Sequence, residues 1–541
     1  MSSTGTHPRL VVRYENGKPR LEESRQGAPD RNRQEDRPPS SNSGGASPAA
    51  PDKGQVIPPP LEEPNAPPES AFTAPKTILA LLVFLGVLLV QVFYFMGVGF
   101  NRVDDNITWV IPLNVGMALL VCLMQPMLIF CFIASFFPFS SAGLELEVGV
   151  VTLNPYSLGI MLMVPIGLLH KTVHNHRLPL HGSDLCLLLA CMLLMVSTLL
   201  GENLIRGGFI AFNAVFIPVL AMLCIRLMVQ NEMEYGLLVR VMLAMILLFG
   251  AIAISFYAQT GTRVTPLNTR PISAASCLVL AIFYYALGKY YPRPFRIAAF
   301  LFCLLGFALT FSRVFTLVML LSPLMYLAIK RGKAFLLFLG FFAGTLVLTI
   351  FLVAAADMFR PQSYTYKEGL HKSSERLTDT DDMHLALYGR ILTYKQGLDA
   401  FLERPFVGTG PRPSFTATGT TQHNFTVEWL EYGGLIGYIL FVGFFLLHVK
   451  RVGALARDDL YLRINLLVLI AVMANAFFNG IMHGLMPYVA FTAIGLSEAR
   501  YPLVRRRLEE QEKEQVARDE AAQKTQTVPQ KKGLGYEFSV R

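Results

Sequence analysis

The sequence has little charge for its length. Only 16% of its 541 residues are charged, whereas 53% are hydrophobic, and the mean hydropathy is +0.44. A soluble enzyme of this size carries a larger share of charged residues on its surface. The composition therefore excludes a soluble globular protein and indicates a polytopic membrane protein.

Cysteine patterns and metal-ligand patterns are also scarce. All seven cysteines lie in or at the edges of apolar runs, where they act as small packing residues and form neither a disulfide framework nor a metal site. No HExxH spacing occurs. The acidic stretch from Asp379 to His384 falls in an expected loop, where carboxylates are more often solvated than metal-bound. We expect no metal and no cofactor.

Nucleotide-binding motifs are missing as well. The chain has no Walker loop and no dinucleotide fingerprint after a strand. Its net charge of +9 has a plain source in basic residues between apolar runs, so no nucleic-acid partner is expected. No basic start is followed at once by an apolar core, so a cleavable signal peptide is not predicted.

Apolar runs of the length that crosses a bilayer recur between residues 77 and 500. A hydrocarbon core of roughly 30 Å needs about 17 to 25 apolar residues in helical form, and helices pair their backbone polar groups internally, as lipid requires. The sequence therefore predicts an all-α membrane protein. Its helices are expected at 77–98, 107–138, 150–169, 184–200, 208–229, 237–259, 273–290, 296–312, 314–330, 334–358, 428–449, 461–480 and 484–499.

The basic connections predict the orientation of these helices. "HKTVHNHR", "KYYPRPFR", "KRGK" and "KRVGALARDD", together with "RYPLVRRR" after the last helix, should be cytoplasmic. Alternation then places the large loop 359–427 on the other, periplasmic face. The same alternation gives a cytoplasmic N-terminus if the 107–138 run crosses twice, with its break at "QPM". If that run crosses once, either the N-terminus lies outside or a short run such as 150–169 is interfacial. The expected number of transmembrane helices is therefore 12 to 14.

Two polar tails flank this membrane domain, which spans residues 77–500. Residues 1–76 are rich in Pro, Ser, Gly and charge and cannot bury enough apolar surface to fold, so a disordered cytoplasmic tail is predicted. Residues 501–541 read as a charged cytoplasmic tail, a helix that frays into disorder.

One motif in the large loop carries a family resemblance. "GRILTYKQGLDAFLERPFVGTGP" is followed by "HNFTVEWLEYGGLIG", in which His423 and Asn424 precede Gly434 by nine intervening residues and Gly437 follows. This pattern resembles the signature of the O-antigen ligase and polysaccharide polymerase superfamily. "LTFSRVF" around Arg313 resembles a second feature of that family, a Ser-Arg pair at an outward turn.

The resemblance implies a glycosyltransferase-C-like fold and a membrane glycan transferase. Its donor would be an undecaprenyl-pyrophosphate-linked glycan, its acceptor a lipid A core sugar or a lipid-linked repeat unit, and its site the periplasmic face of the bacterial inner membrane, among membrane lipids. The chemistry suits the residues. Arginine binds phosphate oxygens bidentately and stabilises a departing pyrophosphate, and histidine titrates near neutrality and accepts a proton.

The resemblance implies roles for three of the candidate site residues. His423 is expected to be the general base, and Arg313 and Arg263 to grip the pyrophosphate. Asn424 orients the histidine or a sugar, and Glu431 fixes the geometry of the site. Arg390 is a further candidate for substrate binding, with simple pairing to acids of the loop as the alternative. Arg206 and Arg270 compete with Arg263, and Gly433 and Gly434 alternatively only permit close helix packing.

Three versions of the activity stay open: ligase, polymerase and transfer to a protein hydroxyl. A transporter or flippase is the alternative of another class, for which the polar residues of "NAFFNGIMHG", among them Asn475 and Asn479, are the best argument. Against it, no matching halves are present, and the conspicuous polar residues gather at one membrane face.

Overall fold

The structure is a computed structural model. It describes residues 10–15, 18–23, 126–139, 146–148, 151–173, 180–201, 204–261, 271–359, 380–411, 424–481 and 484–526, with a few single positions between 82 and 116. His423, Arg263 and Arg270 lie outside the described residues, as do most of the expected helices 77–98 and 107–138.

The chain divides into two units, Met1–Glu69 and Ser70–Arg541. The first contains an antiparallel hairpin of β1 (Leu10–Glu15) and β2 (Lys18–Glu23), in which Leu10 pairs with Glu23. This hairpin falls within the predicted disordered tail; the other residues of that unit lie outside the described part of the chain.

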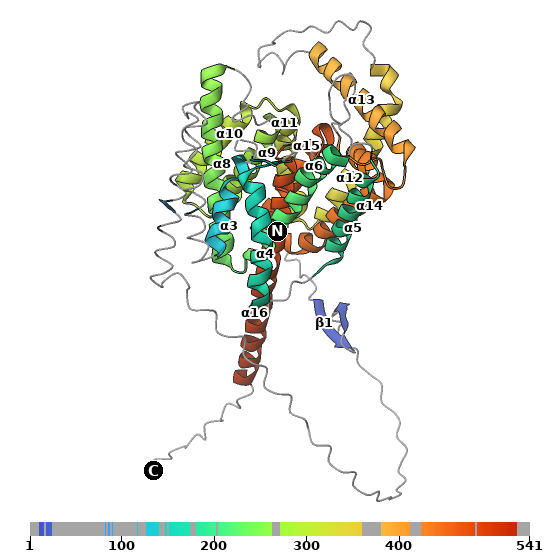
Figure 1. Ribbon diagram of the computed structural model, residues 1–541. Helices are drawn as coiled ribbons and strands as arrows, with labels where there is room; N and C mark the ends of the chain where they lie inside the picture. The colour runs from blue at the N-terminus through green and yellow to red at the C-terminus, as the bar shows by residue number, and fades with distance from the viewer. Residues whose placement is uncertain are drawn as a thin grey trace, which may run out of the picture. The chain divides into compact units, whose positions relative to one another are not determined.

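The second unit is a helical bundle (Figure 1). Seven of its described helices are long and apolar enough to cross a membrane, and shorter apolar helices accompany them. This confirms the all-α polytopic class. Within the described residues its elements are α3 (Pro126–Ser135), β3 (Leu146–Val148), β4 (Val151–Leu153), α4 (Pro155–Val173), α5 (Gly182–Leu199), α6 (Leu204–Ala211), α7 (Ile217–Met228), α8 (Glu232–Thr260), α9 (Pro271–Leu287), α10 (Arg293–Ala308), α11 (Arg313–Lys330), α12 (Ala334–Ala354), α13 (Thr380–Glu403), α14 (Phe425–Ala456), α15 (Leu460–Asn479) and α16 (Met486–Gln526), with a short π-helix, Phe212–Phe216, joining α6 to α7.

One long helix, α13, differs from the sequence-based expectation. The large loop 359–427 was expected without regular structure, but it contains the 24-residue helix α13, whose polar composition conceals it from a search for apolar runs. Helix α16 covers the last predicted span, 484–499, and continues without interruption to Gln526, so it includes the charged helix that was expected after residue 500; residues of high helix propensity prolong it. The total of 12 to 14 crossings stays a prediction.

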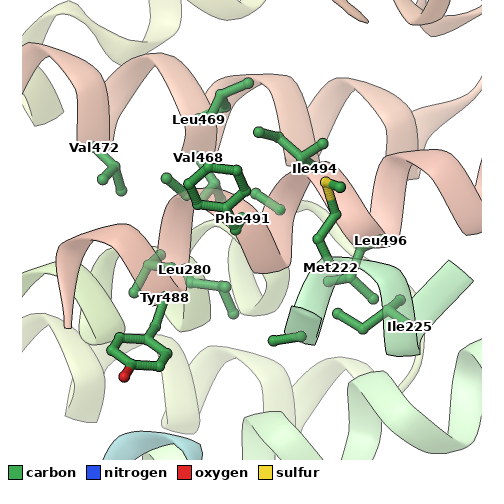
Figure 2. Close-up of a cluster of buried hydrophobic side chains, with 14 of the residues drawn as sticks. Met222, Ile225, Leu280, Val468, Leu469, Val472, Tyr488, Phe491, Ile494 and Leu496 are labelled. Carbon is green, nitrogen blue, oxygen red and sulfur yellow. The ribbon is translucent and has the colours of Figure 1, made fainter. Parts of the chain in front are cut away.

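The core lies where α7, α9, α15 and α16 meet. Val468 and Leu469 of α15 face Phe491 and Ile494 of α16, and Met222 of α7 closes the cluster (Figure 2). Of the candidate span of α15, 78% is buried in the protein, against 22% for α11. Helix α15 is therefore central, and α11 turns most of its apolar surface to the lipid, which solvates it as well as protein would.

Ion pairs gather at one end of the bundle. Arg500 of α16 pairs with Asp459, the N-cap of α15, at 2.8 Å and also with Glu232 at the start of α8. Arg226 pairs with Asp184 at 2.9 Å. Asp184, Arg226, Glu232 and Asp459 lie at helix ends that the basic connections predict to be cytoplasmic, and Arg500 follows the predicted span 484–499 on the same side. The candidate site lies at the opposite helix ends.

Candidate functional site

Helix α14 begins at the family-like motif, and Asn424 is its N-cap. The Asn424 Oδ1 accepts hydrogen bonds from the backbone N–H groups of Thr426 at 2.8 Å and Val427 at 3.3 Å. Its Nδ2 donates to the Thr349 hydroxyl of α12 at 3.0 Å. Asn424 is completely buried. Its amide is therefore occupied by the protein, which favours an orienting role over direct contact with a sugar.

A break in α14 follows nearly three turns later. Gly434 has φ 66° and ψ −169°, which are not helical, and residues 405–411, here called the docked segment, lie against it. The Thr409 N–H donates to the Glu431 carbonyl at 2.8 Å, and the Leu435 N–H donates to the Pro405 carbonyl at 2.8 Å. The docked segment thereby satisfies backbone groups that the break releases, as a membrane protein requires.

The glycines of the motif make this contact possible. Gly408 and Gly434 have positive φ values of 78° and 66°, a conformation that L side chains rarely adopt. A Cβ on Gly434 would lie 2.4 Å from the Phe406 carbonyl carbon and oxygen, and one on Gly410 would lie 2.5 Å from the Ser197 carbonyl oxygen. Gly434 therefore does more than permit close helix packing: it forms the break in α14.

Arg313 lies at the turn that joins α10 to α11. Phe311 has φ 48°, the positive-φ conformation that only it adopts among the described non-glycine residues, and Ser312 is the N-cap of α11. Arg313 is thus the first residue of α11. A cation at this position is repelled by the partial positive charge of the helix N-terminus. Its Nη2 is buried and has no hydrogen-bond partner among the described residues.

Arg390 of α13 lies close to Arg313. Burial lowers the pKa of Arg390, and the positive charge of Arg313 lowers it further. Within the described part of the chain, no carboxylate forms an ion pair with either arginine, in contrast to Arg226 and Arg500 at the other end of the bundle. The alternative that Arg390 pairs with acids of the loop thus gains no support from those residues.

A small apolar cluster attaches α13 to the bundle. Ile391 and Tyr394 of α13 pack with Leu352 of α12 and Val427 of α14. The Tyr394 hydroxyl hydrogen-bonds to the Asn424 side chain, and burial raises the pKa of Tyr394 to about 12. Tyr394 lies one helical turn after Arg390, so both belong to the same face of α13.

Two acids of α14 are buried below its start. The Glu428 Oε2 accepts a hydrogen bond from the Ile481 backbone N–H at 2.8 Å, which fastens the connection between α15 and α16 to α14. The Glu431 side chain is also buried, and its carbonyl receives the docked segment. Near them, the Asn479 Nδ2 donates to the Asn475 Oδ1 at 2.9 Å in the last turn of α15.

The structure brings some of the predicted residues together. Arg313 and Arg390 are neighbours, and Asn424 and Glu431 lie on the α14 segment beside them. Arg206 is in α6, but its side chain is not among the described ones. Sequence analysis missed Tyr394, Thr349 and Glu428. The signal for Tyr394 was its spacing of four residues from Arg390; Thr349 gave none, because its partner Asn424 is distant in sequence.

A family model matches the part of the chain that contains most of these residues. Residues 298–442 match the family model described as O-antigen ligase, and no curated protein matches the chain. The matched range contains Arg313, Arg390, His423, Asn424 and Glu431, whereas Arg263 falls outside it. The match supports a membrane glycan ligase or polymerase kind of function, with lipid-linked glycans as the substrates. The chain is thus a multi-pass membrane protein, and its residues 298–442 are similar to the O-antigen ligase family.

Proposed function

We propose that the protein transfers a glycan from an undecaprenyl-pyrophosphate donor to a sugar hydroxyl at the periplasmic face of the bacterial inner membrane. One observation carries the proposal: Arg313 and Arg390 lie together beside the start of α14, with no carboxylate paired to either among the described residues. Two neighbouring cations of this kind suit a ligand with several negative charges.

The reaction is a displacement at the anomeric carbon of the donor sugar. The bond from that carbon to the pyrophosphate oxygen breaks, and the acceptor hydroxyl oxygen forms the new glycosidic bond. Arg313 and Arg390 would bind the pyrophosphate and stabilise the negative charge that grows on it as it leaves. Partial burial weakens the screening of the two positive charges, which strengthens this stabilisation.

His423 would accept the proton of the acceptor hydroxyl, a step worth about 10² to 10⁴ in rate. Its support is its place in the motif, directly before the N-cap Asn424, and its inclusion in the O-antigen ligase match. Asn424 would orient the start of α14, and Glu431 would hold the docked segment through its carbonyl. Arg263 is retained as a further phosphate ligand on the resemblance alone.

The distribution of charge supports the periplasmic orientation of the site. Arg226 lies in the last turn of α7, Arg451 lies near the end of α14 that is opposite Asn424, and Arg500 directly follows the predicted span 484–499. The positive-inside rule assigns such positions to the cytoplasm. The polar residues of α15 do not favour a transporter, because Asn475 and Asn479 are buried and bond to one another at the same end as Arg313.

The test is an analysis of glycans in a host that lacks the protein, with lipid-linked glycans separated by length. Accumulation of long chains on the polyprenyl carrier would identify a ligase, and accumulation of single repeat units would identify a polymerase. If neither pool changed, glycan transfer would be refuted and a transport function would replace it. Re-expression of the wild-type chain serves as the control.

A further inference from the structure

Helix α13 places the positive charge of Arg390 near that of Arg313. Arg390 and Arg313 repel each other, and among the described residues no acid is paired to either of them to offset the repulsion. Helix α13 is moreover polar and lies outside the candidate membrane spans, so lipid does not hold it in place. Contacts with the bundle must therefore keep Arg390 beside Arg313.

Two such contacts are present. At the end of α13, the Arg404 Nη1 donates to the Leu200 carbonyl at 2.8 Å. In the middle of the helix, Ile391 and Tyr394 pack onto Leu352 and Val427. Tyr394 lies directly beside Arg390 on the same face of α13, because residues four apart in a helix lie one above the other.

The hydroxyl of Tyr394 extends this contact into a hydrogen-bonded chain across three helices. It bonds to the Asn424 side chain, and the Asn424 Nδ2 donates to Thr349 of α12 at 3.0 Å. The Asn424 Oδ1 is fixed as well, because it caps α14. Tyr394 and Asn424 are both buried, so water does not compete for these bonds.

We propose that Tyr394 is a positioning residue that holds Arg390 against Arg313 by fastening α13 to the Asn424 cap and Thr349. The inference rests on the proposed function, which supplies the pyrophosphate that the two arginines bind. Tyr394 itself does not contact substrate. It lowers the cost of donor binding by keeping the two cations together before the donor arrives.

The test compares Tyr394→Phe with the wild-type full-length protein in lipid bilayers, with a lipid-pyrophosphate-linked glycan as donor. Phenylalanine keeps the ring in its apolar cluster and removes the hydroxyl alone. We expect the KM for the donor to rise about three- to tenfold, the size of one lost hydrogen bond, with a smaller change in kcat. The shape of the pH profile should not change, because the Tyr394 hydroxyl, with its pKa raised to about 12, stays protonated at neutral pH.

Two further variants separate positioning from a general loss of structure. Tyr285→Phe removes another buried tyrosine hydroxyl, which donates to the Leu243 carbonyl at 3.1 Å away from the site, and should leave the KM unchanged. In an Arg390→Gln background, Tyr394→Phe should add nothing, because the cation that it holds is gone. An unchanged KM in Tyr394→Phe, or an equal effect in both backgrounds, would overturn the inference.

Hydrogen exchange tests the fastening of α13 by Tyr394 separately from the proposed function. If Tyr394 fastens α13, the amides of residues 380–403 should exchange faster in Tyr394→Phe than in the wild type or in Tyr285→Phe. Unchanged exchange would refute the fastening whatever the activity. Conversely, wild-type transfer by Arg313→Gln and Arg390→Gln would refute the pyrophosphate role of the arginines while the exchange result still decides whether Tyr394 holds α13.

Discussion

Gly408 and Gly434 are in direct backbone contact. A Cβ on Gly408 would lie 2.5 Å from the Gly434 nitrogen, and both residues have positive φ. The contact joins the docked segment to the break in α14, one turn after Glu431 and two to three turns after Asn424. The spacing of glycines in the motif therefore reflects a requirement of the backbone close to the proposed site.

Gly408→Ala should prevent the docked segment from seating in the break. The added methyl meets backbone atoms that cannot move aside, and the positive φ adds strain, so we expect a loss of at least about 2 kcal/mol in stability. Thermal unfolding in detergent measures this. Gly340→Ala is the control, because nothing lies within 4 Å of its Cβ; equal melting of both variants would contradict the role given to Gly408.

Arg313→Lys should impair transfer severely although it keeps the charge. An ammonium cannot reproduce the bidentate fork of a guanidinium on a pyrophosphate, so we expect kcat/KM to fall by at least about tenfold. Arg331→Lys is the matched control, since Arg331 is exposed at the other end of α11. Wild-type turnover by Arg313→Lys would show that Arg313 supplies only charge.

His423→Ala should abolish glycan transfer without reducing the amount of protein in the membrane. Loss of a general base lowers the rate by about 10² to 10⁴. Transfer is measured with lipid-linked donor and acceptor, and the protein is quantified in the membrane fraction. His371→Ala, which changes another histidine of residues 359–427, should transfer normally. Undiminished transfer by His423→Ala would remove it as the base.

Asn424→Ala should lower both stability and transfer. It removes the N-cap of α14, a loss of about 0.5 to 2 kcal/mol, and also the bonds to Thr349 and Tyr394. Asn231→Ala removes the N-cap of α8, where the Asn231 side chain accepts from the Glu234 N–H, and should lower stability alone. The two variants are compared at equal amounts of folded protein; equal transfer by both would count against an orienting role for Asn424.

Arg500→Ala should destabilise the protein strongly and leave transfer per folded molecule unchanged. The change lies away from the candidate site. It leaves Asp459 buried without its main partner, at a cost of about 3 to 5 kcal/mol. The double change Arg500→Met with Asp459→Asn should recover much of that loss. Melting temperatures test both expectations, and a specific loss of transfer by Arg500→Ala would link the two ends of the bundle.

The sequence by itself determined the class of protein and most of its helices. A continuously apolar run satisfies its backbone polar groups in lipid as a helix, so α5, α9 and α15 follow from local composition and lie within three residues of their predicted bounds, while α8 begins five residues earlier than predicted. The motif also indicated His423, Asn424 and Gly434, because a family pattern is written in the linear sequence. Helix α13 was not predicted from the sequence, because its contacts with the bundle, and not its composition, identify it as part of the domain.

Only the tertiary structure decided how these residues combine. Arg313 and Arg390 are far apart in the chain, and their approach depends on the packing of α13 against α12 and α14. The use of the Asn424 amide as a cap and as a partner of Thr349 likewise depends on where α12 ends. Periodicity and composition report the surroundings of each residue along the chain, whereas the contacts that hold two cations together arise from segments that folding brings side by side.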